Sequence, residues 1–381
     1  TCKAFWNLRD EVPIKVPCLV SSGSNMARIH CQETGVQLRK IRHTAKVIAV
    51  ATSEKFIATA CQDGDNQVHL WDLFGTHVWS GDNGHGETDA CKLELSSNGL
   101  WLVVYCDYSN FVVVYNTIQG KQQRLGSLLQ GGIMISSSGK LAIYGLQTNS
   151  TRRPTLSLWS LSHDNDAKLQ LEIFLTHNPG TLVFSPDEKT FATNVCEKVH
   201  LWDAEYQPDS GYSPQLYIFR KHTHQVNSVS FLGGCVVSCC SEKLYIWRSD
   251  VIAGWGELIF VMELCKPPNY YPTTRFSCSS TNANLIATTN RRSFRLYTQD
   301  IGMGFRLIEE MQIPIEFQYD LMFDFSPDGK KLVMTTGFLV GPLALLDLST
   351  YTAKELDIDN DAVTGAAFGY WLVHMKSNIV I

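Results

Sequence analysis

Short segments of alternating apolar and polar residues recur along the chain. Four of them end in Trp followed by a polar residue: QVHLWD at 67–72, TLSLWS at 155–160, KVHLWD at 198–203 and KLYIWR at 243–248. Alternation with a period of two is typical of β-strands, because successive side chains of a strand point to opposite faces of its sheet. The pattern therefore predicts an all-β protein built from repeats that contain one such strand each.

The Trp position also gives the length of the repeat. With substitutes allowed, the series is Cys31, Trp71, Tyr115, Trp159, Trp202, Trp247, Tyr297 and Leu346. Its members are separated by 40, 44, 44, 43, 45, 50 and 49 residues. Intervals of ~40–45 residues are typical of the four-stranded blades of a β-propeller, and the two longer intervals indicate longer loops.

Short polar turns recur between the first and second strands of most repeats. They are Ser96-Ser-Asn-Gly99, Ser136-Ser-Ser-Gly139, Ser185-Pro-Asp-Glu188 and Ser326-Pro-Asp-Gly329. Ser, Pro, Asp, Asn and Gly supply the fixed φ, the side-chain caps and the positive φ that tight turns require. We therefore expect each repeat to be a four-stranded meander whose third strand carries the Trp.

With these features the chain resembles the WD-repeat (WD40) β-propellers. The resemblance is carried by Trp71-Asp72, Trp202-Asp203, Gly84-His85 and the histidines His43, His177 and His222, which stand where the family's histidine belongs. It covers residues 43–357 well and the two ends weakly.

The resemblance implies a buried hydrogen-bond network of His, Ser or Thr, an acid and Trp in some blades. One network would consist of His43, Thr59, Asp65 and Trp71. A second would consist of His222, Ser238, Glu242 and Trp247, with Glu in place of Asp. Tyr115, Tyr297 and Leu346 replace the Trp in other repeats, and we expect apolar packing to hold those blades.

We expect a single propeller domain over residues 1–381, to which the segments 1–42 and 358–381 contribute the closing blades. Residues 363–381 are expected to supply two or three strands. An N-terminal strand would complete their blade, because closure of the ring removes exposed strand edges. The periods favour eight blades, with seven and nine as alternatives.

Composition and charge narrow the class of protein. With 44% hydrophobic and 18% charged residues, the chain can bury a large core. Its net charge of -5 argues against nucleic acid as a direct ligand, since phosphate backbones require clustered Lys and Arg. Apolar runs such as 100–106 are far shorter than the ~20 residues of a membrane helix. We therefore expect protein or peptide partners and no association with a membrane.

The twelve cysteines are expected to be reduced thiols. The sequence contains no Cys-x-x-Cys, and Cys61, Cys106 and Cys239 lie within apolar strands. The expected location is the cytoplasm, with the nucleus as the alternative.

One group of residues offers metal ligands by its spacing: His222 and His224 precede Cys235, Cys239 and Cys240. However, His222 has a structural position in the repeat, and the cysteines lie in an apolar strand. We therefore expect neither a metal nor a cofactor.

A catalytic triad is also not expected, because His, Ser or Thr and an acid recur from repeat to repeat, whereas a triad occurs once. A propeller enzyme would instead carry one non-repeating cluster of acids and His in its central channel.

Places where the repeat is interrupted are the candidate partner contacts, since Arg and exposed aromatic residues are enriched at interface hot spots. They are Tyr108, Arg152, Arg153, Trp255, Arg291 and Arg292. The sequence thus predicts a non-catalytic interaction scaffold or sensor. By family analogy it would be part of a larger signalling ATPase of the NACHT or apoptosome kind. The alternative is an adaptor subunit of an RNA-associated or ubiquitin-ligase complex.

Overall fold

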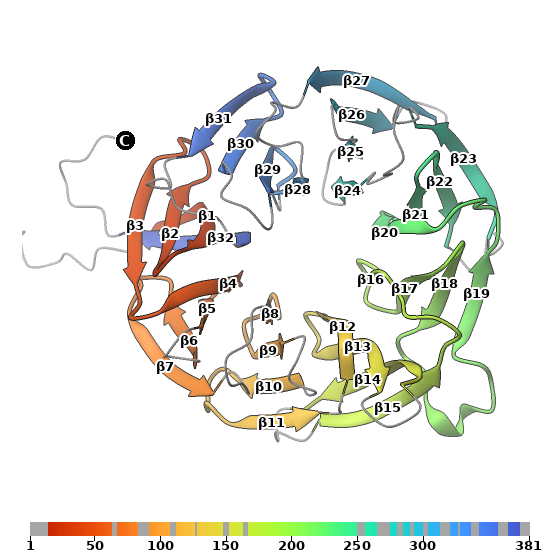
Figure 1. The fold of residues 1–381 in the computed structure, drawn as a ribbon, viewed down its shortest axis with the longest axis horizontal. Coiled ribbons are helices and arrows are strands. Elements are labelled where there is room, and N and C mark those ends of the chain that lie inside the picture. Colours follow the sequence, from red (N-terminus) through yellow and green to blue (C-terminus); the bar gives the residue numbers. More distant parts are fainter. Residues whose placement is uncertain are drawn as a thin grey trace, which may run out of the picture.

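The computed structural model shows a ring of β-sheets (Figure 1). It describes residues 14–62, 67–82, 91–106, 112–125, 128–147, 152–162, 167–249, 256–264, 275–279, 285–289, 293–299, 304–312, 321–326, 328–336, 343–356 and 365–373. Within these ranges the strands form eight four-stranded antiparallel sheets. The predicted all-β propeller is confirmed, and of the three blade numbers considered, eight is correct.

Seven blades consist of four consecutive strands, which run from the centre of the ring outward (Figure 1). Their strands are β4 (Lys46–Thr52), β5 (Phe56–Gln62), β6 (Gln67–Asp72) and β7 (His77–Asp82); β8 (Cys91–Leu95), β9 (Trp101–Cys106), β10 (Val112–Asn116) and β11 (Gln122–Leu125); β12 (Leu128–Ile135), β13 (Lys140–Gln147), β14 (Pro154–Leu161) and β15 (Ala167–Phe174); β16 (Leu182–Phe184), β17 (Thr190–Val195), β18 (Lys198–Asp203) and β19 (Gln215–Phe219); β20 (Val226–Leu232), β21 (Cys235–Cys240), β22 (Lys243–Arg248) and β23 (Leu258–Glu263); β24 (Arg275–Ser279), β25 (Leu285–Thr289), β26 (Ser293–Gln299) and β27 (Phe305–Gln312); β28 (Leu321–Phe325), β29 (Lys331–Thr336), β30 (Leu343–Asp347) and β31 (Thr352–Leu356). A 3-10 helix, η1 (Pro208–Ser210), lies between β18 and β19.

The eighth blade joins the two ends of the described chain. It has the order β3-β2-β1-β32, with β1 (Ile14–Gly23), β2 (Met26–Cys31), β3 (Gln37–Arg42) and β32 (Gly365–Val373). Strands β1 and β32 pair antiparallel from Ile14 opposite Val373 to Ser22 opposite Gly365. Closure by N- and C-terminal strands is therefore confirmed. The number of strands from each end differs from the expectation. The N-terminal segment supplies three strands, and the described part of the C-terminal segment supplies one.

The core lies between neighbouring blades. Between blade β4–β7 and blade β8–β11, for example, Leu70 packs with Leu102 and Tyr115. Because both faces of a blade are covered in this way, middle strands are buried almost throughout, as in β10 and β25. This explains why some strands of the sequence show a continuous apolar run instead of alternation.

The turns between first and second strands lie on one face of the ring, which we call the turn face. Oγ of Ser185 donates a hydrogen bond to Oδ1 of Asp187 (2.6 Å) and accepts one from the backbone N of Thr190 (3.0 Å). Ser326 and Asp328 form the same hydrogen bond (2.5 Å). The Ser-Pro-Asp sequences thus form the self-capped turns that their composition predicts.

Turns of neighbouring blades also contact one another on the turn face. The carboxylate of Glu188 accepts hydrogen bonds from the backbone N atoms of Ser137 (2.7 Å) and Ser138 (3.0 Å) in the preceding blade. Burial alone would raise the pKa of Glu188, but these hydrogen bonds outweigh it and lower the pKa to about 2. Asn98, one blade earlier, donates to the carbonyl of Ser137. Three successive blades are therefore connected at their turns.

Two further expectations from the sequence concern membrane-spanning segments and the state of the cysteines. No helix in the described ranges has the length and hydrophobicity that crossing a membrane requires. Cys61 and Cys239 are buried free thiols, as expected, whereas the side chain of Cys106 lies outside the described part.

Candidate functional site

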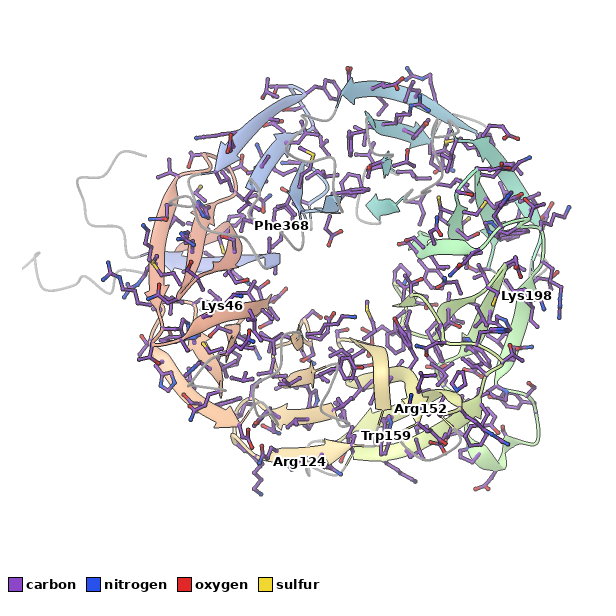
Figure 2. The ribbon with its side chains drawn as sticks, in the orientation of Figure 1. Lys46, Arg124, Arg152, Trp159, Lys198 and Phe368 are labelled. Carbon is purple, nitrogen blue, oxygen red and sulfur yellow. The ribbon has the colours of Figure 1, made fainter. Side chains whose placement is uncertain are left out.

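The connection between β13 and β14 carries the two arginines predicted to contact a partner. Arg152 and Arg153 are both exposed. The β13–β14 connection lies at the opposite strand ends from the β12–β13 turn, on the face that we call the loop face. Arg152 is labelled in Figure 2. The backbone N of Gln147 donates to the carbonyl of Arg153 (3.0 Å), which joins the ends of the two strands. Arg152 has φ 43, a left-handed value that is uncommon for residues other than Gly. Residues 148–151 lie outside the described part.

An exposed aromatic ring lies beside Arg153. The guanidinium carbon of Arg153 is 5.8 Å from the ring centroid of Phe174, within the range of a cation–π contact. Phe174 ends β15 opposite Thr155 and remains 53% exposed. Sequence reasoning missed Phe174, although its place at the end of an outermost strand was a usable signal. We call Arg152, Arg153 and Phe174 the Arg–Phe patch.

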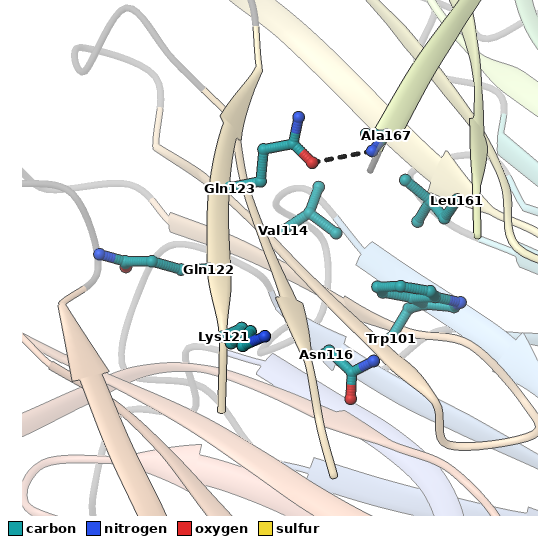
Figure 3. Close-up of a pocket in the computed structure, with 8 residues that line it drawn as sticks. All are labelled: Trp101, Val114, Asn116, Lys121, Gln122, Gln123, Leu161 and Ala167. Atoms are coloured by element: carbon teal, nitrogen blue, oxygen red, sulfur yellow. Dashed lines mark hydrogen bonds between the residues drawn. The ribbon is translucent and has the colours of Figure 1, made fainter. Parts of the chain in front are cut away.

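A pocket of about 420 Å³ opens between blades β8–β11 and β12–β15 (Figure 3). Its lining residues are Trp101, Val114, Asn116, Lys121, Gln122, Gln123, Leu161 and Ala167. Oε1 of Gln123 accepts a hydrogen bond from the backbone N of Ala167 (2.8 Å), which links the two outer strands. Leu161 and Ala167 flank the β14–β15 connection, so the pocket lies toward the turn face, away from the Arg–Phe patch.

The structure does not describe the other residues predicted to contact a partner. Tyr108, Trp255, Arg291 and Arg292 lie outside the described residues. The predicted grouping of four arginines on one face therefore stays a prediction.

The residues of the first blade network are partly brought together. Nε1 of Trp71 donates to Oγ1 of Thr59 (3.0 Å). Nδ1 of His43 lies 3.2 Å from Sγ of Cys61, a residue that the predicted network did not include. Asp65 lies outside the described residues.

The second network is more compact. Oγ of Ser238 contacts Nε2 of His222 (2.7 Å) and accepts a hydrogen bond from Nε1 of Trp247 (2.8 Å). Glu242 instead lies 3.7 Å from Nδ1 of His224. Burial lowers the pKa of His222 to about 4, so its imidazole is neutral at pH 7.

Two further Trp residues donate to a hydroxyl without having been assigned to a network. Nε1 of Trp202 donates to Oγ1 of Thr193 on the second strand of its blade (2.9 Å). Nε1 of Trp159 donates to Oγ of Ser157 on its own strand (3.1 Å). The indole-to-hydroxyl hydrogen bond thus recurs in four blades. Its recurrence indicates a structural role, because buried Trp N–H groups need an acceptor wherever they occur.

Comparison with known proteins tests the fold. No protein-family model and no curated protein sequence matches the chain. Among solved structures, the C-terminal WD40 domain of Sif2 is 14% identical, with a TM-score of 0.62 over 86% of this chain and 91% of that chain. Sqt1 from Saccharomyces cerevisiae is 14% identical, with a TM-score of 0.63 over 85% and 88% of the two chains. The protein has the fold of a WD40 β-propeller.

A WD40 propeller is in general a non-catalytic platform, but similar rings occur in enzymes. The dihydro-heme d1 dehydrogenase NirN is 12% identical to this chain, with a TM-score of 0.62 over 93% of this chain and 74% of that chain. The fold alone therefore does not decide the function, which has to be argued from surface residues and sites.

Among the described residues, an acid on an innermost strand has a strongly raised pKa. Glu94 lies on the innermost strand β8, and burial raises its pKa to about 7. Lys92 opposes this effect and Asp324, on the innermost strand β28, adds to it. A carboxyl group with such a pKa is the kind of residue that a catalytic propeller would need.

The structure also identifies which His and Cys residues converge. Cys239 and Cys240, weighed as metal ligands from their spacing, direct their thiols at the backbone carbonyls of Cys240 (3.1 Å) and Lys243 (3.5 Å). Within the described residues, the group whose donor atoms lie close enough to share a metal ion is His43, Cys61 and His69. Sequence reasoning missed this group, because its members come from three separate segments.

Proposed function

We propose that this propeller is a non-catalytic protein-interaction scaffold whose partner docks on the Arg–Phe patch. The observation that carries the proposal is the contact between Arg153 and Phe174, which holds a cation over an aromatic ring that is 53% exposed. Arg152 adds a second cation in a left-handed conformation, and such conformations are common where a loop is shaped for a ligand.

The chemistry of the patch indicates the partner. Arginine forms bidentate hydrogen bonds with carboxylates, and the Phe ring offers apolar area beside them. We infer a protein or peptide that presents an acidic residue next to an apolar one. The net charge of -5 makes a nucleic acid a poor direct ligand for the ring as a whole. The cytoplasm, with the nucleus as the alternative, is the location we propose.

The test compares partners retained by the immobilised wild-type protein and by Arg152→Glu/Arg153→Glu in native extract. Lys198→Glu/Arg220→Glu is the matched control, since both residues are exposed and lie where β18 begins and just after β19 ends, at the loop-face ends of another blade. Lys198 is labelled in Figure 2. We expect the patch variant to lose at least one partner that the control variant keeps, and Phe174→Ser to weaken the same partner. Retention of every partner by the patch variant would refute the docking face.

The wider setting of the scaffold is a finer proposal that rests on the sequence resemblance. We favour a ligand-sensing propeller of a larger protein, such as a NACHT or apoptosome-like signalling ATPase. The alternative is an adaptor subunit of an RNA-associated or ubiquitin-ligase complex. Binding that weakens steeply with salt, in proportion to the number of phosphates contacted, would favour RNA.

A catalytic function is the competing proposal, and Glu94 is the observation in its favour. Because the folded-state pKa is raised to about 7, the stability contributed by neutral Glu94 is present below about pH 4.5 and is lost as the pH rises through 7. Glu94→Gln should therefore stabilise the protein at pH 8 by up to ~3 kcal/mol relative to pH 4.5, measured by urea unfolding. If the scaffold proposal holds, this variant keeps the partner. A catalytic activity that Glu94→Gln abolishes would overturn it.

A further inference from the structure

The residues His43, Cys61 and His69 meet in blade β4–β7. His43 precedes β4, Cys61 lies on β5 and His69 lies on β6. Nδ1 of His43 is 3.2 Å from Sγ of Cys61, and the two imidazole centroids are 5.0 Å apart. One donor atom from each of the three residues lies within 4.8 Å of the other two. Three side chains with metal-binding chemistry therefore face a common point.

This spacing is close to that of a zinc site. Tetrahedral Zn²⁺ has Zn–N distances of about 2.0–2.1 Å and Zn–S distances of about 2.3 Å, which places neighbouring donor atoms ~3.3–3.6 Å apart. Nδ1 of His43 and Sγ of Cys61, which are 3.2 Å apart, are close to this separation. No two donor atoms of the group are more than 4.8 Å apart. Small side-chain rotations would therefore complete the geometry.

The surroundings support the same chemistry. Cys61 is fully buried, and His69 is half-buried. Ser80 on β7 contacts Nδ1 of His69 (2.8 Å) and Nε2 of the exposed His77 (2.7 Å). A hydrogen bond to one ring nitrogen fixes an imidazole and directs the other nitrogen to a metal, as is common in metal sites.

We propose that His43, Cys61 and His69 form a Zn²⁺ site of the Cys-His₂ type, with the fourth position open to water. Imidazole and thiolate ligands in a tetrahedral arrangement suit Zn²⁺, whereas Mg²⁺ and Ca²⁺ require oxygen ligands. Binding replaces the proton of the Cys61 thiol, which is released to solvent. The site is in a different blade from the Arg–Phe patch, so it does not depend on the proposed function.

Another blade of the same protein serves as an internal reference. Its third strand KVHLWD places His200 opposite Thr193, as QVHLWD places His69 opposite Thr59. There, Val195 stands at the position of Cys61, and Nδ1 of His200 is 3.0 Å from Oε1 of Gln215. The histidine of the strand is therefore shared by both blades, but the proposed metal site is found in one of them.

The test is calorimetric titration of the chelator-treated, desalted full chain with Zn²⁺ alone. We expect one ion per chain in the wild type, with the affinity reduced at least ~100-fold in Cys61→Ser and in His69→Gln and unchanged in His200→Gln. Ser80→Ala, which removes the supporting hydrogen bond, should reduce the affinity by roughly tenfold. No measurable binding by the wild type overturns the proposal, as does equal weakening by His200→Gln.

A second readout separates loss of the site from loss of the fold. Because Cys61 is buried, Cys61→Ser can unfold the blade, so the half-buried His69→Gln carries the test. Zn²⁺ should raise the thermal unfolding temperature of the wild type and of His200→Gln but not that of His69→Gln. Co²⁺ used as the probe should give a thiolate charge-transfer band in the wild type. Persistence of that band in Cys61→Ser, or of the thermal shift in His69→Gln, would refute the assignment.

Discussion

Blades β4–β7 and β16–β19 carry nearly the same third strand in different surroundings. In both, the Trp of the Trp-Asp dipeptide donates to a Thr on the second strand, at 3.0 Å from Trp71 and 2.9 Å from Trp202. Trp202 is only 2% exposed, whereas Trp71 is partly exposed. The common hydrogen bond therefore does not imply a common environment.

The rings around the two tryptophans show the difference. Trp71 meets His43 and His77 edge-on, at centroid distances of 5.4 and 5.1 Å. Trp202 is stacked on His200 at 5.6 Å with an interplanar angle of 12° and on Phe191 at 6.2 Å with an angle of 17°. One blade thus groups polar imidazoles near its surface, and the other forms a closed stack. The repeated sequence specifies the hydrogen bond that the Trp donates. The positions that vary between blades specify which side chains surround that Trp.

Replacing each of the two tryptophans by Ala should give the largest difference in lost stability between these blades. Trp202→Ala should destabilise the protein by about 4 kcal/mol, because a fully buried ring is lost. Trp71→Ala should cost only about 2 kcal/mol, since a partly exposed ring loses less buried area. Urea unfolding with the Trp→Phe variants as controls measures both. Equal losses would mean that the comparison of the two environments is wrong.

Substitution of the residue after the shared Thr should give the next largest loss of stability. It is the buried Ala60 in one blade and Asn194 in the other. Oδ1 of Asn194 accepts from the backbone N of Thr181 (2.6 Å), and its Nδ2 donates to the carbonyl of Val226 (2.5 Å) in the next blade.

Asn194→Ala should therefore cost about 2–3 kcal/mol, because buried groups lose their partners. Asn194→Asp keeps an oxygen that accepts from Thr181. At a pH where the new carboxyl group is neutral, it should destabilise the protein less than Asn194→Ala does. Thermal unfolding would detect both changes. A cost below ~0.5 kcal/mol for Asn194→Ala would show that water replaces the side chain.

The smallest expected loss of stability is at the turn that joins blade β16–β19 to blade β12–β15. The pKa of Glu188 is lowered to about 2, so its stabilising contribution is present above about pH 4.5 and is lost as the pH falls toward 2. Glu188→Gln should cost at most ~1 kcal/mol at pH 6, since the side chain is only partly buried, and almost nothing near pH 2. Glu197→Gln, at an exposed acid of the same blade, is the control. A difference that does not vary with pH would contradict the assigned hydrogen bonds.

The regular part of the fold was predictable because each repeat carries its own signals. The Trp spacing favoured eight blades, and the short polar turns located the hairpins between first and second strands. The blade of Tyr115, which lacks the Trp, was expected to be held more by apolar packing. In the structure Tyr115 is buried, and its OH lies within hydrogen-bond distance of two acceptors, Oε1 of Gln122 (2.8 Å) and the carbonyl of Asp82 in the neighbouring blade.

The convergence of side chains was not predictable, because it depends on irregularities of strand pairing. In blade β4–β7 a bulge follows Leu70, so that Trp71 pairs with His77. The same irregularity precedes Trp159, Trp202 and Trp247. A bulge shifts the facing residue by one place. For this reason the neighbours of Phe174 could not be read from sequence spacing.

The pairing of β1 with β32 has a consequence for the timing of folding. Strands β1–β3 are synthesised hundreds of residues before their partner, which at 5–20 residues per second is roughly 20–70 s. During that interval β1 presents an unpaired edge to any extended segment nearby. Pro17 lies within β1 and has no N–H to donate. It therefore limits the hydrogen bonds that a foreign strand could make before β32 closes the ring.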